Sequence, residues 1–367
     1  MTSGEAPSRI AVVGTGLIGT SIAMAAVRAG DRVAGYDLDR DALADAATRT
    51  ALEPRPTLEE CVRGARFVFV CTPIPAIADV AGASLSADGR AVVSDVGSVK
   101  SKVLGEVELR VASNRRARFV GGHPMGGSER TGPEGASASL IEGAAWVLTP
   151  APWTDPATTT ALEGYVASIG AHPLRMDAER HDRLVAVVSH LPQVVSSALM
   201  TLVAGDWVDD SEALTLAATG FRDVTRLAGS DPHLWSGILQ ANREALIEAI
   251  DQYVDALTRF RSSVAERRDA DLEEALESAR MARAQLGAKP RVRAGMALLQ
   301  VPVPDRPGVL AEMTAALGRG RVNIEDLQIV HSPWGPDGVV HLTVLAERAE
   351  AALEVLVAGR FHPVRVA

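Results

Sequence analysis

Two loops of this sequence combine glycines with a side chain that could take part in catalysis. The segment GGHPMGGSE carries one histidine, His123, where an imidazole of ordinary pKa is a competent base at neutral pH. The segment DVGSVK turns at a glycine and leaves Ser98 near a helix start. On the residues alone, Ser98 could equally be a helix N-cap, and most isolated histidines are structural. Either residue acts on a ligand only if both loops follow strand ends at one edge of a sheet.

A glycine-rich turn near the amino end would bring a reaction partner to that edge. The sequence GTGLIG directly follows the first expected strand and opens a helix, which is the context that a GxGxxG motif requires. Gly14 allows the tight turn, Gly16 lets a pyrophosphate approach the backbone, and Gly19 lets the helix lie close to the strand. The alternative is an ordinary strand-to-helix turn. We predict that a dinucleotide is bound by Gly14, Gly16, Leu17, Ile18, Gly19, Asp37 and Thr72.

The end of the second expected strand indicates which dinucleotide binds. Asp37 lies 18 residues after Gly19, where a carboxylate accepts hydrogen bonds from both ribose hydroxyls and repels a 2′-phosphate. This position favours NAD over NADP, although Arg40 lies close enough to weaken the preference. The alternative is that Asp37 caps the next helix. Thr72 ends another strand at the same crevice, whereas its neighbour Cys71 is better explained as core packing.

Polar side chains also interrupt two apolar stretches later in the chain, SHLPQ at residues 189–193 and FRDVTRLA at residues 221–228. Buried polar groups of this kind must be paired or functional. On the residues alone, Arg226 is as well explained by an ion pair with Asp223 as by ligand binding. An internal hydrogen-bonded network is expected among His181, Asp182 and His190.

The elements that must position these residues are strands alternating with helices. Residues 10–176 alternate short β-branched apolar runs with helical stretches, which predicts a parallel sheet covered on both faces. With GTGLIG, this pattern indicates a Rossmann-like, doubly wound dinucleotide-binding domain at residues 1–176. Strands are expected at residues 10–13, 32–36, 67–71, 91–94, 118–120, 145–148 and, more weakly, 172–175.

An all-helical second domain is expected at residues 177–287, because apolar residues recur there at three- and four-residue steps. Residues 177–204 predict one long, largely buried helix that Pro192 should kink. Helices this apolar usually pack on a partner, so we hypothesise a homodimer formed through this domain.

A third domain is expected after a basic segment with glycine and proline, which predicts a linker at residues 288–295. The domain would cover residues 296–367 with the ferredoxin-like order βαββαβ. Its strands are expected at residues 296–303, 322–331, 338–345 and 363–366, and its helices at residues 308–318 and 348–358.

The composition excludes several classes of function. With 367 residues, 47% hydrophobic and 23% charged, the chain is globular and long enough for two or three domains. A formal net charge of −9 disfavours nucleic acid as a partner. The two cysteines form no cluster with metal-ligand spacing, so no metal is expected. Without an apolar leader or a run of about 18 apolar residues, we expect a cytoplasmic protein that does not span a membrane.

Five motifs of this sequence resemble those of the prephenate/arogenate dehydrogenase family of tyrosine biosynthesis. They are GTGLIG, DVGSVK, GGHPMGGSE, SHLP and FRDVTRLAGSDPHLW, and the resemblance covers residues 9–285. It implies an oxidative decarboxylation in which NAD accepts the hydride from C4 of prephenate. Carbon dioxide leaves from C1, and 4-hydroxyphenylpyruvate results.

The resemblance also implies residue roles. His123 matches the general base on the 4-hydroxyl, Ser98 the hydroxyl that orients this histidine and the substrate, and Arg226 the arginine that binds a substrate carboxylate. Gln193 departs from the family, because in several members a histidine ends the SHLP run. If Gln193 contacts the substrate side chain, the choice between prephenate and arogenate stays open, with prephenate preferred. Positions that line or gate the pocket are matched by Glu129, His190 and Trp235.

The C-terminal segment resembles the ACT domain, a module that binds amino acids in many biosynthetic enzymes. The match consists of VPDRPGVL at residues 303–310 and RVNIEDL at residues 321–327. It implies an effector site in which Asp305, Gly308 and Asn323 frame the ammonium and carboxylate of an amino acid. Tyrosine is the expected effector. Phenylalanine, another amino acid, or a purely structural and dimerising sheet are the alternatives.

We therefore expect an NAD-dependent prephenate dehydrogenase that is regulated by tyrosine. The nearest alternatives are an arogenate dehydrogenase and a 4-amino-4-deoxyprephenate dehydrogenase, for which the same base and hydride chemistry would serve. A different class of protein is an amino-acid sensor on a Rossmann scaffold. Such a sensor would have no need to keep His123, Ser98 and Arg226 together.

Overall fold

The computed structural model describes residues 8–126, 132–205, 214, 216–284, 295–304, 306–331 and 337–365. The chain forms two compact units, Met1–Ala256 and Leu257–Ala367, and each is described by itself. The three-domain division with boundaries after residues 176 and 287 stays a prediction, and nearly all of the expected linker lies outside the described residues.

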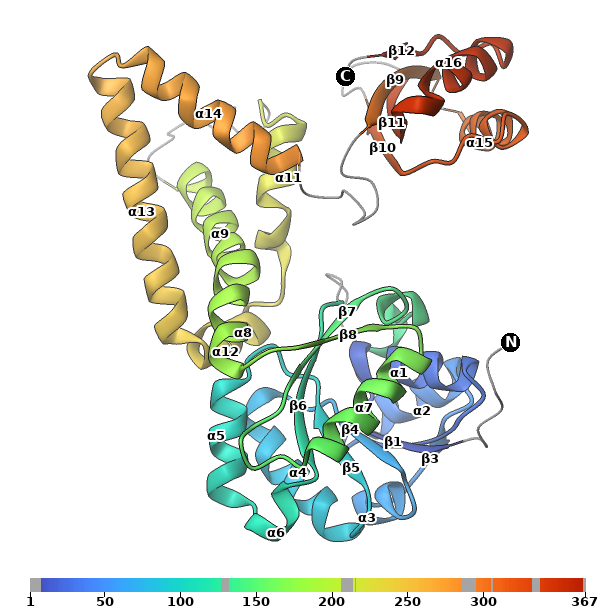
Figure 1. Cartoon of the computed structure of the whole chain (residues 1–367), viewed down its shortest axis with the longest axis vertical. Helices are drawn as coiled ribbons and strands as arrows, with labels where there is room; N and C mark the ends of the chain where they lie inside the picture. Colours follow the sequence, from blue (N-terminus) through green and yellow to red (C-terminus); the bar gives the residue numbers. More distant parts are fainter. Residues whose placement is uncertain are drawn as a thin grey trace. The chain divides into compact units, whose positions relative to one another are not determined.

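The first unit is built on an eight-stranded sheet with the order β3-β2-β1-β4-β5-β6-β7-β8 (Figure 1). The strands are β1 (Arg9–Val13), β2 (Arg32–Tyr36), β3 (Glu53–Pro54), β4 (Phe67–Val70), β5 (Val92–Asp95), β6 (Phe119–Pro124), β7 (Ala145–Thr149) and β8 (His172–Arg175). The seven expected strands are present, and the two-residue strand β3 was not expected. The expected parallel sheet is present, except that β6 and β7 pair antiparallel. The described residues of their connection contain only the short 3₁₀ turns Pro133–Gly135 and Ala138–Leu140 and no long crossover helix, and β7 runs back along β6.

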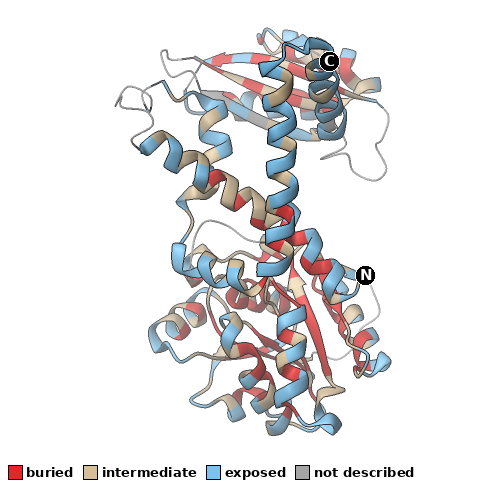
Figure 2. Cartoon of the chain, turned by 90° about the vertical axis from the view of Figure 1, so that its left-hand side faces the viewer, coloured by how far each residue is buried: buried red, intermediate tan, exposed pale blue. Residues whose placement is uncertain are grey.

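Helices cover both faces of this sheet, which is why its strands are apolar throughout. The helices are α1 (Leu17–Arg28), α2 (Arg40–Arg49), α3 (Leu58–Val62), α4 (Ile77–Ala87), α5 (Ser101–Arg110), α6 (Ser113–Arg116) and α7 (Pro156–Ser168). Alternate residues of β1 enter different cores: Ile10 and Val12 belong to one buried cluster, and Ala11 and Val13 to the other. Figure 2 shows the central strands as a buried layer. The sheet is therefore a rigid platform whose strand ends can hold a site.

A helical segment follows β8. It contains α8 (Ala178–Val185), the π-helical turn η4 (Ala186–His190), α9 (Leu191–Ala204), α11 (Thr219–Thr225), the 3₁₀ turn η5 (Arg226–Gly229), α12 (Pro232–Ala241) and α13 (Arg243–Ala265), and α13 runs into the second unit. The expected long helix is present as the continuous run of α8, η4 and α9. Its widened π turn lies directly before Pro192, where the missing N–H and the ring disrupt normal α-helical bonding.

The expectation that this long helix is largely buried is wrong within one chain. In α9 only Gln193 and Ser196 are buried. Val188 in η4 and Leu202 in α9 are exposed. By length and composition alone, residues 178–204 could cross a membrane. The buried side of the helix, however, carries His181 and other polar groups that are hydrogen-bonded to the sheet unit, which is the pattern of a helix packed on protein.

The second unit contains α14 (Asp269–Ala284) and a four-stranded sheet with the order β10-β11-β9-β12. The order along the chain is β9 (Met296–Pro304), α15 (Val309–Arg319), β10 (Asp326–His331), β11 (Asp337–Leu345), α16 (Ala349–Ala358) and β12 (Val364–Arg365), as predicted for βαββαβ. Along β9, buried and partly exposed residues alternate, so one face of the sheet packs on the two helices.

Candidate active site

The glycine-rich turn after β1 has the geometry that its sequence predicts. Gly14 has a φ of +99°, and a Cβ there would lie 2.5 Å from the carbonyl oxygen of Cys71. A Cβ on Gly19 would lie 1.9 Å from the carbonyl oxygen of Gly14, so α1 can approach β1 only with glycine at that position. A Cβ on Gly16, by contrast, would meet nothing within 4 Å. The backbone at the start of α1 is therefore open to a ligand.

The surroundings of this turn fit a dinucleotide. The Asp37 carboxylate, at the end of β2, accepts hydrogen bonds from the backbone N–H of Thr15 at 2.6 Å and from its hydroxyl at 3.0 Å. The Thr72 hydroxyl, after β4, is buried and has no hydrogen-bond partner among the described residues. An open helix start, a carboxylate and an unpaired hydroxyl thus surround the place where a dinucleotide is expected. Leu17 and Ile18, the first residues of α1, are partly exposed beside it.

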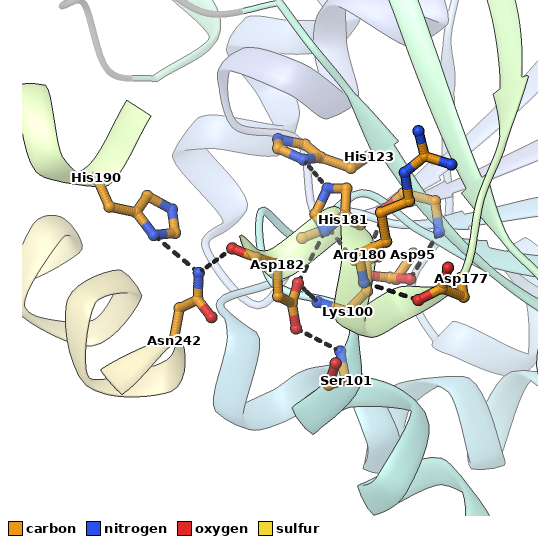
Figure 3. Close-up of polar contacts among 12 residues, drawn as sticks. Asp95, Lys100, Ser101, His123, Asp177, Arg180, His181, Asp182, His190 and Asn242 are labelled. Atoms are coloured by element: carbon orange, nitrogen blue, oxygen red, sulfur yellow. Dashed lines mark hydrogen bonds and ion pairs between the residues drawn. The ribbon is translucent and has the colours of Figure 1, made fainter. Parts of the chain in front are cut away.

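His123 lies in β6, at the carboxyl end of the strand, and takes part in a chain of hydrogen bonds (Figure 3). Its Nδ1 is 2.8 Å from Nε2 of His181, and Nδ1 of His181 is 2.8 Å from the Asp182 carboxylate. That carboxylate also accepts the backbone N–H groups of Lys100 and Ser101, each at 2.8 Å. This series of hydrogen bonds therefore connects β6 to α8 and to the start of α5.

A buried ion pair fixes the strand ends on either side of His123. Lys100 and Asp95 are fully buried and paired with each other. Nζ of Lys100 also donates to the carbonyl oxygen of Gly122 at 2.7 Å, and the N–H of Gly122 donates to Asp95 at 3.1 Å. Because Gly122 precedes His123, this pair locks the backbone of β6 against β5 next to the imidazole.

The electrostatics keep His123 uncharged. Burial lowers the pKa of His123 well below its usual value, and the positive charge of Lys100 lowers it further. Burial also lowers the pKa of His190 to about 4. Burial alone would raise the pKa of Asp182, but hydrogen bonds from His181 and the Lys100 N–H lower it overall. At neutral pH the site therefore holds an uncharged His123 imidazole and an ionised Asp182 carboxylate.

Ser98 lies in the loop between β5 and α5 and is partly exposed. The resemblance implies that its hydroxyl orients His123, but among the described residues that hydroxyl makes no hydrogen bond, and the partner of His123 is His181. Sequence reasoning placed His181 in a structural network and missed this contact, for which the only local signal is a histidine–aspartate pair at a helix start. Glu129 lies outside the described residues.

The expected internal network is present and extends to two of the predicted pocket residues. The Asn242 side chain, directly before α13, donates to the backbone oxygen of Asp182 at 2.8 Å and lies 3.1 Å from Nδ1 of His190. The Trp235 ring meets the His190 ring edge-on, with centroids 6.1 Å apart. Hydrogen bonds and ring contacts thus connect the partly exposed His123 and Trp235 through the buried His181, Asp182 and His190.

Gln193 and Arg226 lie at a second contact, between α9 and η5. The Gln193 amide donates to the carbonyl oxygen of Leu227 at 2.9 Å, which holds the residue next to Arg226 against α9. The amide oxygen of Gln193 is buried without a hydrogen-bond partner in the described part of the chain. The Arg226 side chain is exposed at the start of η5. Gln193 therefore contacts Leu227, the residue that follows Arg226 in the sequence.

The residues predicted for an effector are only partly brought together. A cavity of about 210 Å³ lies between the β9–α15 turn and β10, lined by Arg306, Gly308, Leu310 and Ile329 among others. Gly308 has a φ of +90° and begins α15. Asn323 does not line this cavity, and its amide donates to Glu325 at 2.6 Å. Asp305 lies outside the described residues.

An uncharged imidazole at the same sheet edge as a glycine-rich nucleotide-binding turn is what a dehydrogenase requires, because a base must take the proton of the hydroxyl whose carbon loses a hydride. The fold and the site thus define an NAD-dependent dehydrogenase. The family model "Prephenate dehydrogenase, nucleotide-binding domain" matches residues 22–174, and "Prephenate dehydrogenase, dimerization domain" matches residues 177–278. The chain belongs to the prephenate dehydrogenase family.

Individual relatives agree with this assignment. The chain is 30% identical to prephenate dehydrogenase of Bacillus subtilis, over 94% of this chain and 95% of that protein, and 32% identical to cyclohexadienyl dehydrogenase of Zymomonas mobilis, over 70% and 88%. Among solved structures it is similar to prephenate dehydrogenase of Aquifex aeolicus in complex with hydroxyphenyl propionate and NAD+, with a TM-score of 0.70, 28% identity, and coverage of 77% and 100%. Synechocystis arogenate dehydrogenase matches with a TM-score of 0.66, 30% identity, and coverage of 75% and 98%.

Proposed function

We propose that this enzyme oxidises and decarboxylates prephenate to 4-hydroxyphenylpyruvate, with His123 as the general base. The observation that carries the proposal is the uncharged His123 imidazole, held at the strand end by His181 and Asp182. The family and the relatives named above support the choice of substrate.

The proposed roles follow from the chemistry of a ring alcohol. Loss of hydride from the carbinol carbon leaves an oxocarbenium unless the hydroxyl proton departs, so His123 takes that proton. The Ser98 hydroxyl, which has no other partner among the described residues, can bind the same 4-hydroxyl. The Arg226 guanidinium can bind a substrate carboxylate in two places at once. Aromatisation of the ring then drives the loss of carbon dioxide.

NAD supplies the hydride acceptor when it is bound. We propose that Gly14, Gly16 and Gly19 form its pyrophosphate site and that the Thr72 hydroxyl donates to it. Asp37 would exchange its bond to Thr15 for the ribose hydroxyls, and its negative charge would oppose a 2′-phosphate. Arg40 is directed elsewhere, since it donates to the carbonyl oxygen of Pro56 at 2.8 Å, which strengthens the case for NAD over NADP.

A side-by-side assay of NADH or NADPH formation tests substrate and cofactor together. We expect a higher kcat/KM for prephenate with NAD than for any other pairing of prephenate or arogenate with NAD or NADP. Asp37→Asn removes the negative charge, so the ratio of kcat/KM with NAD to kcat/KM with NADP should fall. A lack of turnover with both substrates would refute the proposed function, and a preference for NADP would refute the role of Asp37.

Arogenate is the second candidate, because one observation favours it. The amide oxygen of Gln193 is a buried acceptor without a described partner, and the α-ammonium of arogenate is a donor where prephenate has a keto oxygen. Two results of the same assay would identify arogenate as the substrate. The wild-type enzyme would have a higher kcat/KM for arogenate than for prephenate, and the variant Gln193→Leu would have a lower kcat/KM for arogenate than the wild type.

We further propose a cytoplasmic homodimer. The match of residues 177–278 to a dimerization domain supports association through the helical segment. So do the exposed apolar side chains of that segment, including Val187, Val188 and Leu202 on the long helix and Ile247 on α13.

We also propose that residues 296–367 form an ACT domain that binds tyrosine. The βαββαβ order and the cavity at Gly308 support this assignment. Tyrosine should lower the initial rate of the full-length enzyme, with a coupling of about 1–3 kcal/mol. The inhibition should persist at saturating prephenate, because the residues that line the effector cavity are not those proposed to bind prephenate. No binding of tyrosine by calorimetry, or inhibition that prephenate fully reverses, would exclude this site for tyrosine.

A further inference from the structure

The proton positions in the chain Asp182, His181 and His123 can be worked out from its distances. The Asp182 carboxylate is ionised and can only accept hydrogen bonds. Its partners are two backbone N–H groups and Nδ1 of His181 at 2.8 Å, so Nδ1 of His181 carries a proton. If the His181 ring carries only this one proton, its other ring nitrogen, Nε2, is an acceptor.

The same reasoning fixes the tautomer of His123. Nε2 of His181 lies 2.8 Å from Nδ1 of His123, and opposite such an acceptor this Nδ1 donates and carries the proton. Because His123 is uncharged, its lone pair is on Nε2. An imidazole without a fixed partner would divide between two tautomers, and only the one with an unprotonated Nε2 can use that atom as a base.

We propose that His181 carries one proton, on Nδ1, and is a positioning residue that holds His123 in the tautomer with a free Nε2. Proton abstraction is thereby assigned to Nε2 of His123. This inference rests on the proposed role of His123 as the base. When Nε2 takes the substrate proton, His123 becomes an imidazolium whose Nδ1–H still donates to His181. The Asp182 carboxylate is hydrogen-bonded to Nδ1 of His181, on the far side of that ring from His123. Its negative charge stabilises the His123 cation.

The surroundings of His181 hold its side chain in place, and no other described residue is in a position to hydrogen-bond to the His123 ring. His181 is 1% exposed, and its helix is tied to α5 through Asp182 and to the start of α13 through Asn242. The other charged or titratable groups near His123 are Lys100 and His190. Lys100 is paired with Asp95, and His190 contacts Asn242, so among the described residues only His181 accepts from the His123 ring.

Two variants of His181 separate positioning from simple packing. In His181→Gln, the amide can donate to Asp182 and accept from Nδ1 of His123, whereas His181→Leu can do neither. We expect His181→Leu to lower kcat by about 10- to 100-fold with little change in KM for prephenate or NAD, and His181→Gln to recover most of the loss. Equal losses in the two variants, or an unchanged kcat in His181→Leu, would overturn the proposal.

A direct measurement needs no variant of His181. Histidine labelled with ¹⁵N distinguishes protonated from unprotonated ring nitrogens, and His123→Asn identifies the resonances of His123 among the eight histidines. We expect a protonated Nδ1 and an unprotonated Nε2 in the wild-type enzyme. The reverse tautomer, or an even mixture, would refute the inference even if the enzyme turns over prephenate. Conversely, absence of turnover with the expected tautomer would refute the proposed function alone.

Discussion

Replacing His123 with asparagine should lower kcat by at least about 100-fold while leaving the affinity for NAD within about threefold. Asparagine is close to histidine in size and can hydrogen-bond to His181, so the backbone of β6 should stay in place. It cannot accept a proton at neutral pH, and the hydride transfer would then generate an unstabilised cation on the substrate. Stopped-flow measurement of NADH formation gives the rate, and fluorescence titration gives the affinity for NAD.

The pH dependence adds an independent check on the same residue. Burial and Lys100 lower the pKa of His123, so the base stays unprotonated as the pH falls through the ordinary histidine range. The acid limb of kcat/KM should therefore lie below pH 6.5, which is roughly where an unperturbed histidine would lose activity. The matched control is His172→Asn, at an exposed histidine of β8, which should leave both rate and profile unchanged. Near-normal turnover of His123→Asn would remove His123 from the mechanism.

The geometry of the glycine-rich turn was predictable because its determinants are local in the sequence. Gly14 and Gly19 are required by contacts with the backbone around the turn, and the alternation of strands and helices puts Asp37 at the neighbouring strand end. The rule that ligands bind beyond the carboxyl ends of parallel strands also brought His123 to the correct sheet edge. These inferences need only the strand order that right-handed crossovers impose.

What the sequence could not show depends on contacts between distant residues. The hydrogen bond between His123 and His181 joins residues that are 58 positions apart, and nothing in either local motif specifies it. The antiparallel pairing of β6 and β7 is likewise decided by the path of the connection and not by strand composition. The burial of the long helix was overestimated because an apolar face predicts packing without saying whether the partner belongs to the same chain.

In the C-terminal unit, periodicity predicted the elements well and the effector site less well. The strands and helices follow from alternating and helical apolar patterns, and they form one buried cluster. Gly308 begins a helix beside the cavity, as its motif implied. Asn323 instead pairs with Glu325, because short polar side chains near a strand start readily bond to neighbours two residues away. The position of a side chain in a motif therefore does not fix what it contacts.

Replacing Lys100 with methionine should reduce the free energy of unfolding by about 3–5 kcal/mol, which is the usual effect of removing one partner of a buried ion pair. The Asp95 carboxylate would stay fully buried without its cation, and the carbonyl oxygen of Gly122 would lose its donor. Lys102→Met, on the exposed side of α5, is the matched control and should change stability by less than about 0.5 kcal/mol. Urea unfolding followed by circular dichroism measures both variants.

A double variant tests whether the loss comes from an uncompensated charge. Asp95→Asn removes the charge that Lys100→Met leaves unpaired, so the double variant should be less destabilised than the sum of the two single variants. Burial lowers the pKa of the Lys100 amine, yet Asp95 opposes that shift, so each partner is tolerated only because of the other. Strict additivity would mean that the two residues act independently, and the ion pair would then not be what holds β6 and His123 against β5.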